Sequence, residues 1–195
     1  MSLLKNRDYN LQMNRVAIDI DETLVHFLPN LAKFHKRTLP SGKYKYVYRD
    51  IFQVPEIKSK KMVIDFYKSE EFMELTPIIG CHKKLKEMRQ RVDKMYVITG
   101  RQDYVRKLTE VWLDKHFPGI FDDLLLTNSY TKDEIPKVEL MRSLNIDTLI
   151  DDDYRVCTDA RLNGIKAYNY THIPEYGWCN ESDISLTNWY NLEIK

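Results

Sequence analysis

The chain has 195 residues, of which 43% are hydrophobic and 30% are charged, and its formal net charge is +1. This length fits one domain, or one core domain that carries an insertion. The nearly balanced charge gives no support to nucleic-acid binding, and no apolar run approaches the ~20 residues of a membrane-spanning helix.

The segment from Met1 to Asn14 is polar and lacks the apolar stretch of a signal peptide. We therefore expect a cytoplasmic protein without membrane attachment.

Short apolar runs after this segment predict buried strands, and helical patterns separate most of them. The predicted strands span residues 15–20, 94–99, 123–127, 148–150 and 165–170. Apolar residues at helical spacing predict helices over residues 83–91, 104–116, 136–144 and 155–162. Strands and helices that alternate in this way indicate a parallel sheet covered on both faces. The predicted fold class is α/β, a Rossmann-like three-layer sandwich.

The segment from Val25 to Ile79 interrupts this alternation. It contains two helical patterns, separated by a loop rich in tyrosine that could line a pocket. We interpret the segment as a mostly helical cap inserted after the first strand. Residues 1–24 and 80–195 would then form the catalytic core, and residues 25–79 would form the cap. The tail after Tyr170 carries two tryptophans, and we expect it to pack on the core.

Polar residues stand at the carboxyl ends of three predicted strands. They are Asp19 and Asp21 after the first strand, Thr99 and Gly100 at the second, and Asp151 and Asp152 at the fourth. In open parallel sheets, ligands bind beyond the carboxyl ends of the strands. These three clusters should therefore converge on one edge of the sheet.

Two carboxylates two residues apart can divide the work of phosphoryl transfer. One attacks phosphorus, and the other protonates the leaving oxygen and then deprotonates the hydrolytic water. A divalent metal must offset the repulsion between the carboxylate and the phosphate, and further carboxylates such as Asp151 and Asp152 suit Mg²⁺. The hydroxyl of Thr99 and the open backbone of Gly100 could bind the phosphate.

A cation should also neutralise charge on the transferred group. Lys137, at the start of its predicted helix, is the best placed lysine by chain order, and Lys132 is the alternative. Arg101 could contact the phosphate, or it could form a salt bridge with a neighbouring acid.

These residues resemble the motifs of the haloacid dehalogenase (HAD) superfamily of phosphotransferases. The matching residues are Asp19-Ile20-Asp21-Glu22-Thr23, Ile98-Thr99-Gly100-Arg101, Lys137 and Leu149-Ile150-Asp151-Asp152. The resemblance implies Asp19 as nucleophile and Asp21 as acid and base. It also implies Mg²⁺ held by Asp19, the carbonyl of Asp21 and Asp151, with Asp152 close by. Thr99 and Lys137 would hold the phosphate.

Within the superfamily the chain is most similar to the 5'(3')-deoxyribonucleotidase group. The signs are the cap after the first motif, the run Leu75-Thr76-Pro77-Ile78-Ile79-Gly80, and Trp112-Leu113 followed by His116-Phe117. Phe27 matches a position where that group places an aromatic ring beside the substrate base, although core packing is an equal interpretation. The motifs depart from that group at Glu22-Thr23, where Gly-Val is frequent, and at Gly100-Arg101, where Ser or Ala often follows the Thr.

The expected substrate is a small phosphate ester, and a nucleotide is the first expectation. The alternative functions are a phosphatase of another small phosphate ester, a protein phosphatase and a polynucleotide 3'-phosphatase. The alternative that is not an enzyme is a scaffold on an inactive HAD fold. The sequence leaves open whether the protein is a monomer or a homodimer.

Overall fold

Six parallel strands form one sheet within residues 14–179 and 182–193, the part of the chain that the computed structural model describes. Their order across the sheet is β3-β2-β1-β4-β5-β6. The strands are β1 (Arg15–Ile18), β2 (Lys94–Thr99), β3 (Asp123–Leu126), β4 (Thr148–Asp151), β5 (Lys166–Tyr170) and β6 (Ser185–Leu186). This sheet confirms the predicted α/β Rossmann-like fold. The expectation for Met1 to Asn14 concerns residues that, Asn14 apart, lie outside the described part.

The packing of the central strand β1 explains why its side chains are apolar on both faces of the sheet. Val16 and Ile18 join one hydrophobic cluster, whereas Ala17, between them, joins another. Successive side chains of a strand point to opposite faces of the sheet, so the two clusters are the cores above and below it. All three side chains are fully buried, as expected for a parallel sheet that helices cover on both faces.

Four helices supply the other half of these cores. On the face of Val16 lie α5 (Cys81–Arg89) and α6 (Arg106–His116), and on the face of Ala17 lie α7 (Lys137–Ser143) and α8 (Tyr154–Leu162). The short η1 (Asp103–Val105) leads into α6. No helix among the described residues is both long enough and apolar enough to span a membrane.

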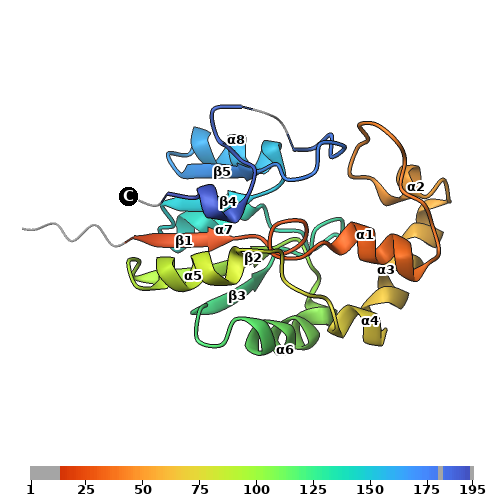
Figure 1. Cartoon of the computed structure of the whole chain (residues 1–195), viewed down its shortest axis with the longest axis horizontal. Coiled ribbons are helices and arrows are strands. Elements are labelled where there is room, and N and C mark those ends of the chain that lie inside the picture. The colour runs from red at the N-terminus through yellow and green to blue at the C-terminus, as the bar shows by residue number, and fades with distance from the viewer. Residues whose placement is uncertain (1–13, 180–181, 194–195) are drawn as a thin grey trace, which may run out of the picture.

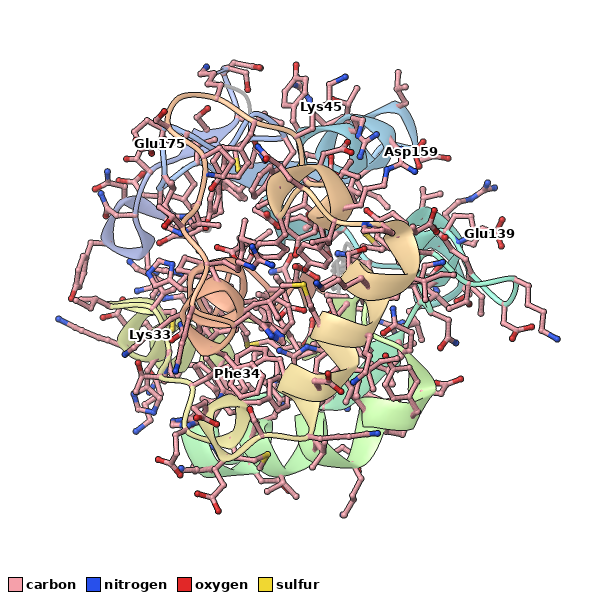
Figure 2. All side chains as sticks on the ribbon, turned by 90° about the vertical axis from the view of Figure 1, so that its right-hand side faces the viewer. Lys33, Phe34, Lys45, Glu139, Asp159 and Glu175 are labelled. Carbon is pink, nitrogen blue, oxygen red and sulfur yellow. The ribbon has the colours of Figure 1, made fainter. Side chains whose placement is uncertain are left out.

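The segment after the first strand is a helical insertion, as predicted. Its helices are α1 (Phe27–Phe34), α2 (Tyr48–Ile51), α3 (Glu56–Tyr67) and α4 (Glu70–Met73). Figure 1 shows them beyond the carboxyl ends of the strands, at the right of the view. Figure 2 looks onto this end of the molecule, with Lys33 and Phe34 of α1 and Lys45 of the loop before α2 labelled.

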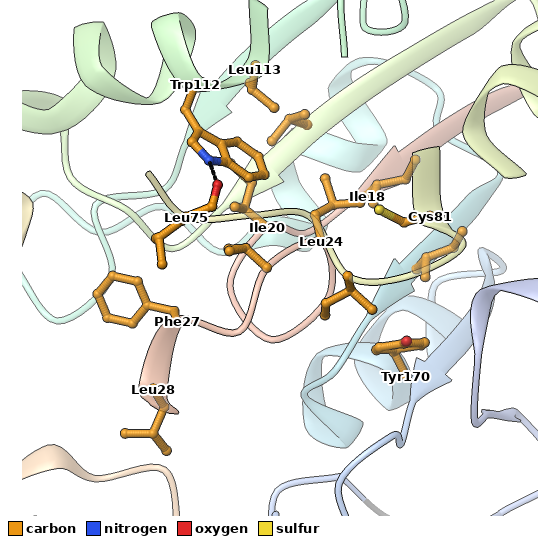
Figure 3. Packing of buried hydrophobic residues seen from close by; sticks show 14 of the residues in the cluster. Ile18, Ile20, Leu24, Phe27, Leu28, Leu75, Cys81, Trp112, Leu113 and Tyr170 are labelled. Carbon is orange, nitrogen blue, oxygen red and sulfur yellow. Dashed lines mark hydrogen bonds between the residues drawn. The ribbon is translucent and has the colours of Figure 1, made fainter. Parts of the chain in front are cut away.

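The two ends of the insertion lie side by side on the core. Val25 and Pro77 form an antiparallel bridge, and the Ile78 amide donates a 2.8 Å hydrogen bond to the Leu24 carbonyl. The buried indole of Trp112 in α6 donates a 2.7 Å bond to the Leu75 carbonyl (Figure 3). The insertion is therefore attached to the core by hydrogen-bonded backbone at both ends.

The C-terminal tail packs on the core, as predicted. Trp178 and Trp189 are 7% and 0% exposed. The indole of Trp189, in η2 (Trp189–Asn191), donates a hydrogen bond to the Thr23 carbonyl. The tail also adds β6 to the edge of the sheet, which the sequence did not predict because two residues are too few to show an alternating pattern.

Candidate active site

Three buried carboxylates meet at the carboxyl edge of the sheet. Asp19 follows β1, Asp151 ends β4, and Asp152 comes directly after it. Their exposures are 5%, 1% and 7%, and one carboxylate oxygen from each lies within 4.8 Å of the others. Adjacent parallel strands β1 and β4 bring these residues together although more than half of the chain separates them.

Lys137 lies between two of these acids. Its Nζ donates a 2.7 Å hydrogen bond to Asp19 Oδ1 and a 2.6 Å bond to Asp151 Oδ2. Burial opposes the charged form of this lysine, but Asp151 and Asp19 outweigh burial and raise its pKa. Lys137 is the first residue of α7, directly after Pro136. Lys132, the alternative lysine, is exposed on the loop before α7.

The charge of this cluster is not balanced by the protein alone. Burial raises the pKa of Asp19 to about 7, against the opposing effect of Lys137. Burial also raises the pKa of Asp151 and Asp152. Lys137 bonds Asp19 and Asp151, whereas Asp152 accepts a bond from the neutral indole of Trp178, so a further cation would favour the ionised forms of the three carboxylates. Oxygen ligands of this kind suit a hard divalent cation, and the cluster therefore fits a metal site.

Asp21 has a different partner from Asp19. Both of its carboxylate oxygens accept hydrogen bonds from Arg101, from Nε at 3.0 Å and from Nη2 at 2.7 Å. Of the two alternatives that the sequence left open for Arg101, this is the salt bridge with a neighbouring acid. Asp21 is therefore fixed by the loop after β2 and not by the carboxylate cluster.

A cavity of about 150 Å³ opens beside these groups. Its lining includes every predicted site residue except Phe27, namely Asp19, Asp21, Thr99, Gly100, Lys137, Asp151 and Asp152. Aromatic side chains of the insertion and the tail also line it: Tyr46, Tyr48, Tyr67 and Trp178. Gly100 approaches another loop closely, since a Cβ there would lie 3.1 Å from the Ser129 hydroxyl oxygen.

The structure does not bring Phe27 to this cavity. Phe27 is 1% exposed, and its ring packs against Phe66 and Tyr67 with centroid distances of 5.3 and 5.6 Å. Of the two interpretations of Phe27, core packing is the one that this geometry supports. Tyr46 and Tyr48, from the tyrosine-rich loop, line the cavity instead.

Two contributors to the site were not found from the sequence. Trp178 donates its indole N–H to Asp152, and Tyr176 donates its hydroxyl to the buried carboxylate of Glu22 at 2.7 Å. Glu22 also accepts a bond from the Leu28 amide at the start of α1. This one side chain therefore connects the loop after β1 with the insertion and with the tail. Its backbone φ is +62°, a conformation that costs energy for a residue with a side chain. In the sequence, the only sign of this role was that Glu22 stands where the similar group frequently has glycine.

Glu22, His26 and His172 form a second group whose ligand atoms lie within 4.8 Å of one another. The carboxylate of Glu22 is already occupied by the two bonds above. The two imidazoles face each other, with 3.2 Å between His172 Nε2 and His26 Nδ1. The glutamate and the two facing ring nitrogens therefore already have partners, although the buried Nδ1 of His172 has none among the described residues. Since three carboxylates offer the oxygen ligands that a hard divalent cation prefers, we assign the candidate metal site to the aspartates.

His172 should make the protein sensitive to acid. Burial, together with a smaller effect of His26, lowers its pKa to about 3. The unfolded chain takes up a proton at this residue below a pH of about 6.5, whereas the folded protein does so only near 3. Stability is therefore lost as the pH falls from about 6.5 towards 3, by up to about 1.4 kcal/mol per unit.

A His172→Gln variant should accordingly lose less free energy of unfolding than the wild type between about pH 7 and about pH 5. Urea unfolding at the two pH values measures the loss in each protein. Glu22 also titrates, but it does so in both proteins, so the comparison isolates His172. His82→Gln is the control. Equal losses in the wild type and in His172→Gln would contradict the assignment.

Three solved structures of similar fold are hydrolases by their descriptions. A haloacid dehalogenase-like hydrolase from Streptococcus pneumoniae has a TM-score of 0.59 at 14% identity, over 84% of this chain and 87% of that chain. The HAD-hydrolase YfnB from Bacillus subtilis, bound to magnesium, has a TM-score of 0.59 at 13% identity, over 91% and 96%. A HAD-superfamily hydrolase from Geobacter sulfurreducens has a TM-score of 0.51 at 15% identity, over 81% and 87%. At these identities the likeness shows the fold.

The class that this fold, its strand-end acids and a family match define is the HAD-like hydrolases. Within that class, a family model described as "5' nucleotidase, deoxy (Pyrimidine), cytosolic type C protein" matches residues 12–161. The chain belongs to this family, and it is a phosphoric monoester hydrolase. A search of curated proteins found no match.

Proposed function

We propose that the protein is a Mg²⁺-dependent 5'-nucleotidase that hydrolyses (deoxy)nucleoside monophosphates through an aspartyl-phosphate on Asp19. The observation that carries the proposal is the carboxylate of Asp19, held by Lys137 at the wall of a cavity that aromatic side chains also line. The description of the family gives the substrate class independent support.

Asp19 is the proposed nucleophile. One of its carboxylate oxygens attacks the phosphorus of the ester, the bond to the leaving oxygen breaks, and an acyl phosphate forms. Lys137 holds Asp19 and would contact the non-bridging phosphate oxygens. The hydroxyl of Thr99 and the backbone beside Gly100 would bind the remaining phosphate oxygens. Gly100 suits this role because it has no Cβ to keep the phosphate away.

Asp21 is the proposed acid and base. It gives a proton to the departing oxygen of the nucleoside, and it later accepts a proton from the water that attacks the acyl phosphate. The products are a nucleoside, inorganic phosphate and regenerated Asp19.

Asp19, Asp151, Asp152 and the carbonyl of Asp21 would hold Mg²⁺. When bound, the metal supplies positive charge that offsets the repulsion between the carboxylates and the phosphate dianion. The proposed requirement for a cation follows from three buried acids, of which Lys137 bonds Asp19 and Asp151. The magnesium bound by the similar Bacillus subtilis structure supports the identity of the cation.

The helical insertion, residues 25–79, is the proposed cap that selects the leaving group. Tyr46, Tyr48 and Tyr67 of this segment line the cavity and offer aromatic faces on which a base could stack. The cavity, about 150 Å³, is smaller than the roughly 300–1,000 Å³ of most small-molecule sites. We therefore expect the cap to move outward to admit a nucleotide. The family description, which names a cytosolic protein, supports a cytosolic location.

A panel of phosphate esters tests the proposal. Deoxyribonucleotides, ribonucleotides, sugar phosphates and phosphopeptides are compared by kcat/KM with Mg²⁺ and after chelation. Nucleoside monophosphates should lead the panel, and chelation should remove the activity. A preference for phosphopeptides or for sugar phosphates would overturn the substrate class and leave phosphatase chemistry intact. Activity that survives chelation would overturn the metal requirement.

A further inference from the structure

Arg101 fixes both oxygens of the proposed acid and base. Arg101 is 2% exposed, and its guanidinium approaches Asp21 with two N–H donors, at 3.0 and 2.7 Å. Such a two-point contact fixes the plane of a carboxyl group, which a single point charge does not. Each carboxylate oxygen has two lone pairs, so one on each remains available for a proton.

The core holds the other side of the same guanidinium. Arg101 Nη1 donates a 3.1 Å hydrogen bond to the hydroxyl oxygen of Thr109 in α6, and that hydroxyl donates to the Val105 carbonyl at 3.0 Å. All three nitrogens of the guanidinium therefore have a partner. The arginine cannot turn without breaking bonds to the acid or to α6.

The insertion packs against the remaining surface of Arg101. The guanidinium carbon lies 6.0 Å from the ring centres of Phe27 and Tyr67 and 5.0 Å from that of Phe72. These rings come from α1, α3 and α4, three helices of the insertion. A cation held against aromatic faces in a buried place is attracted to them. The position of the insertion and that of Asp21 are thus connected through one side chain.

We propose that Arg101 is a positioning residue, which couples the placement of the helical insertion to the orientation of the Asp21 carboxyl group during proton transfer. This inference rests on the proposed function, because it assigns Arg101 to the acid of that reaction. It gives the motif Ile98-Thr99-Gly100-Arg101 a role in catalysis, in which Arg101 acts through Asp21 and not through contact with the phosphate.

A comparison of esters with different leaving groups distinguishes this positioning role from that of a purely structural ion pair. The 5'-oxygen of a nucleoside is a poor leaving group and needs a proton, whereas the phenolate of 4-nitrophenyl phosphate departs without one. The value of kcat/KM covers the steps up to departure of the leaving group, so hydrolysis of the acyl phosphate does not enter. Misplacement of Asp21 should therefore lower kcat/KM for the nucleotide far more than for the activated ester.

The experiment compares Arg101→Met and Arg101→Lys with the wild type on both esters. Each variant should lose about 10²- to 10³-fold in kcat/KM on the nucleotide, which lies within the roughly 10²- to 10⁴-fold contribution of general acid catalysis. The loss on 4-nitrophenyl phosphate should stay below about 5-fold. Lysine should not rescue, because one ammonium cannot make the two-point contact. Arg106→Met, at a half-buried arginine outside the cavity, should leave both values unchanged.

A milder variant covers the case in which Arg101→Met does not fold. Thr109→Val removes only the bond from α6 and should lower the nucleotide value alone, by less than about 10-fold. Equal losses on the two esters, or full rescue by lysine, would overturn the positioning role. If the wild type hydrolyses the activated ester but no nucleotide, the proposed substrate class fails instead. The same ester comparison is then made on the best substrate of the panel.

Discussion

Replacement of Asp19 by Asn should abolish hydrolysis of every phosphate ester while leaving the fold in place. Loss of a nucleophile lowers kcat by about 10⁴- to 10⁶-fold in enzymes that form a covalent intermediate. Asn has the same shape, so the 5%-exposed site can accommodate it. Burial already disfavours the charged form of Asp19, as its raised pKa of about 7 indicates, so we expect little loss of stability.

The measurement is kcat on the best ester of the panel, together with a thermal unfolding curve for each protein. Asp133→Asn provides a matched control, because Asp133 is exposed on the loop before α7. This control should keep wild-type kcat and melting temperature. An Asp19→Asn protein that folds and retains a tenth or more of the activity would exclude Asp19 as the nucleophile.

Replacement of Lys137 by Met should affect both activity and stability. It removes the ammonium group that bonds Asp19 and Asp151, whose side chains are 7% and 1% exposed. Removal of one partner of a buried ion pair costs about 3–5 kcal/mol, because the opposite charge stays buried without compensation. We expect a loss of this size in the free energy of unfolding, measured with urea in the absence of divalent metal.

The same variant should also lose the phosphate contact, and kcat should fall by at least about 10²-fold. Lys132→Met is the control, since the sequence alone left both lysines as candidates, and Lys132 is exposed. It should match the wild type in both measurements. A large loss in Lys132→Met with little change in Lys137→Met would show that the loop lysine moves into the site and that our assignment is wrong.

Most of the fold could be predicted from the sequence, because its signals are local. The runs of β1 and β4 are apolar on both faces, which is typical of a sheet covered by helices. Acids directly after such strands must lie at one edge of a parallel sheet, and Asp19 and Asp151 do lie there. Lys137 could be placed because it opens a helix that leads back from this edge.

The contacts that the sequence could not provide depend on side-chain packing between distant segments. Arg101 and Asp21 are 80 residues apart, and they can pair only because the loop after β2 lies beside the loop after β1. Trp178 reaches Asp152 from a tail that has no helical or strand pattern of its own near it. Phe27 could belong to the core or to the cavity, since an aromatic residue at the start of a helix suits both.

Detection of the covalent intermediate tests the central claim most directly. The wild-type protein is mixed with the best nucleotide substrate and Mg²⁺, quenched in acid within the first turnovers, and reduced with borohydride, which converts an aspartyl-phosphate to homoserine. Peptide mass spectrometry then reads the modified position. We predict homoserine at position 19 in the wild type and none in Asp19→Asn. Homoserine at another aspartate, or turnover in which phosphate never becomes attached to the protein, would contradict the mechanism.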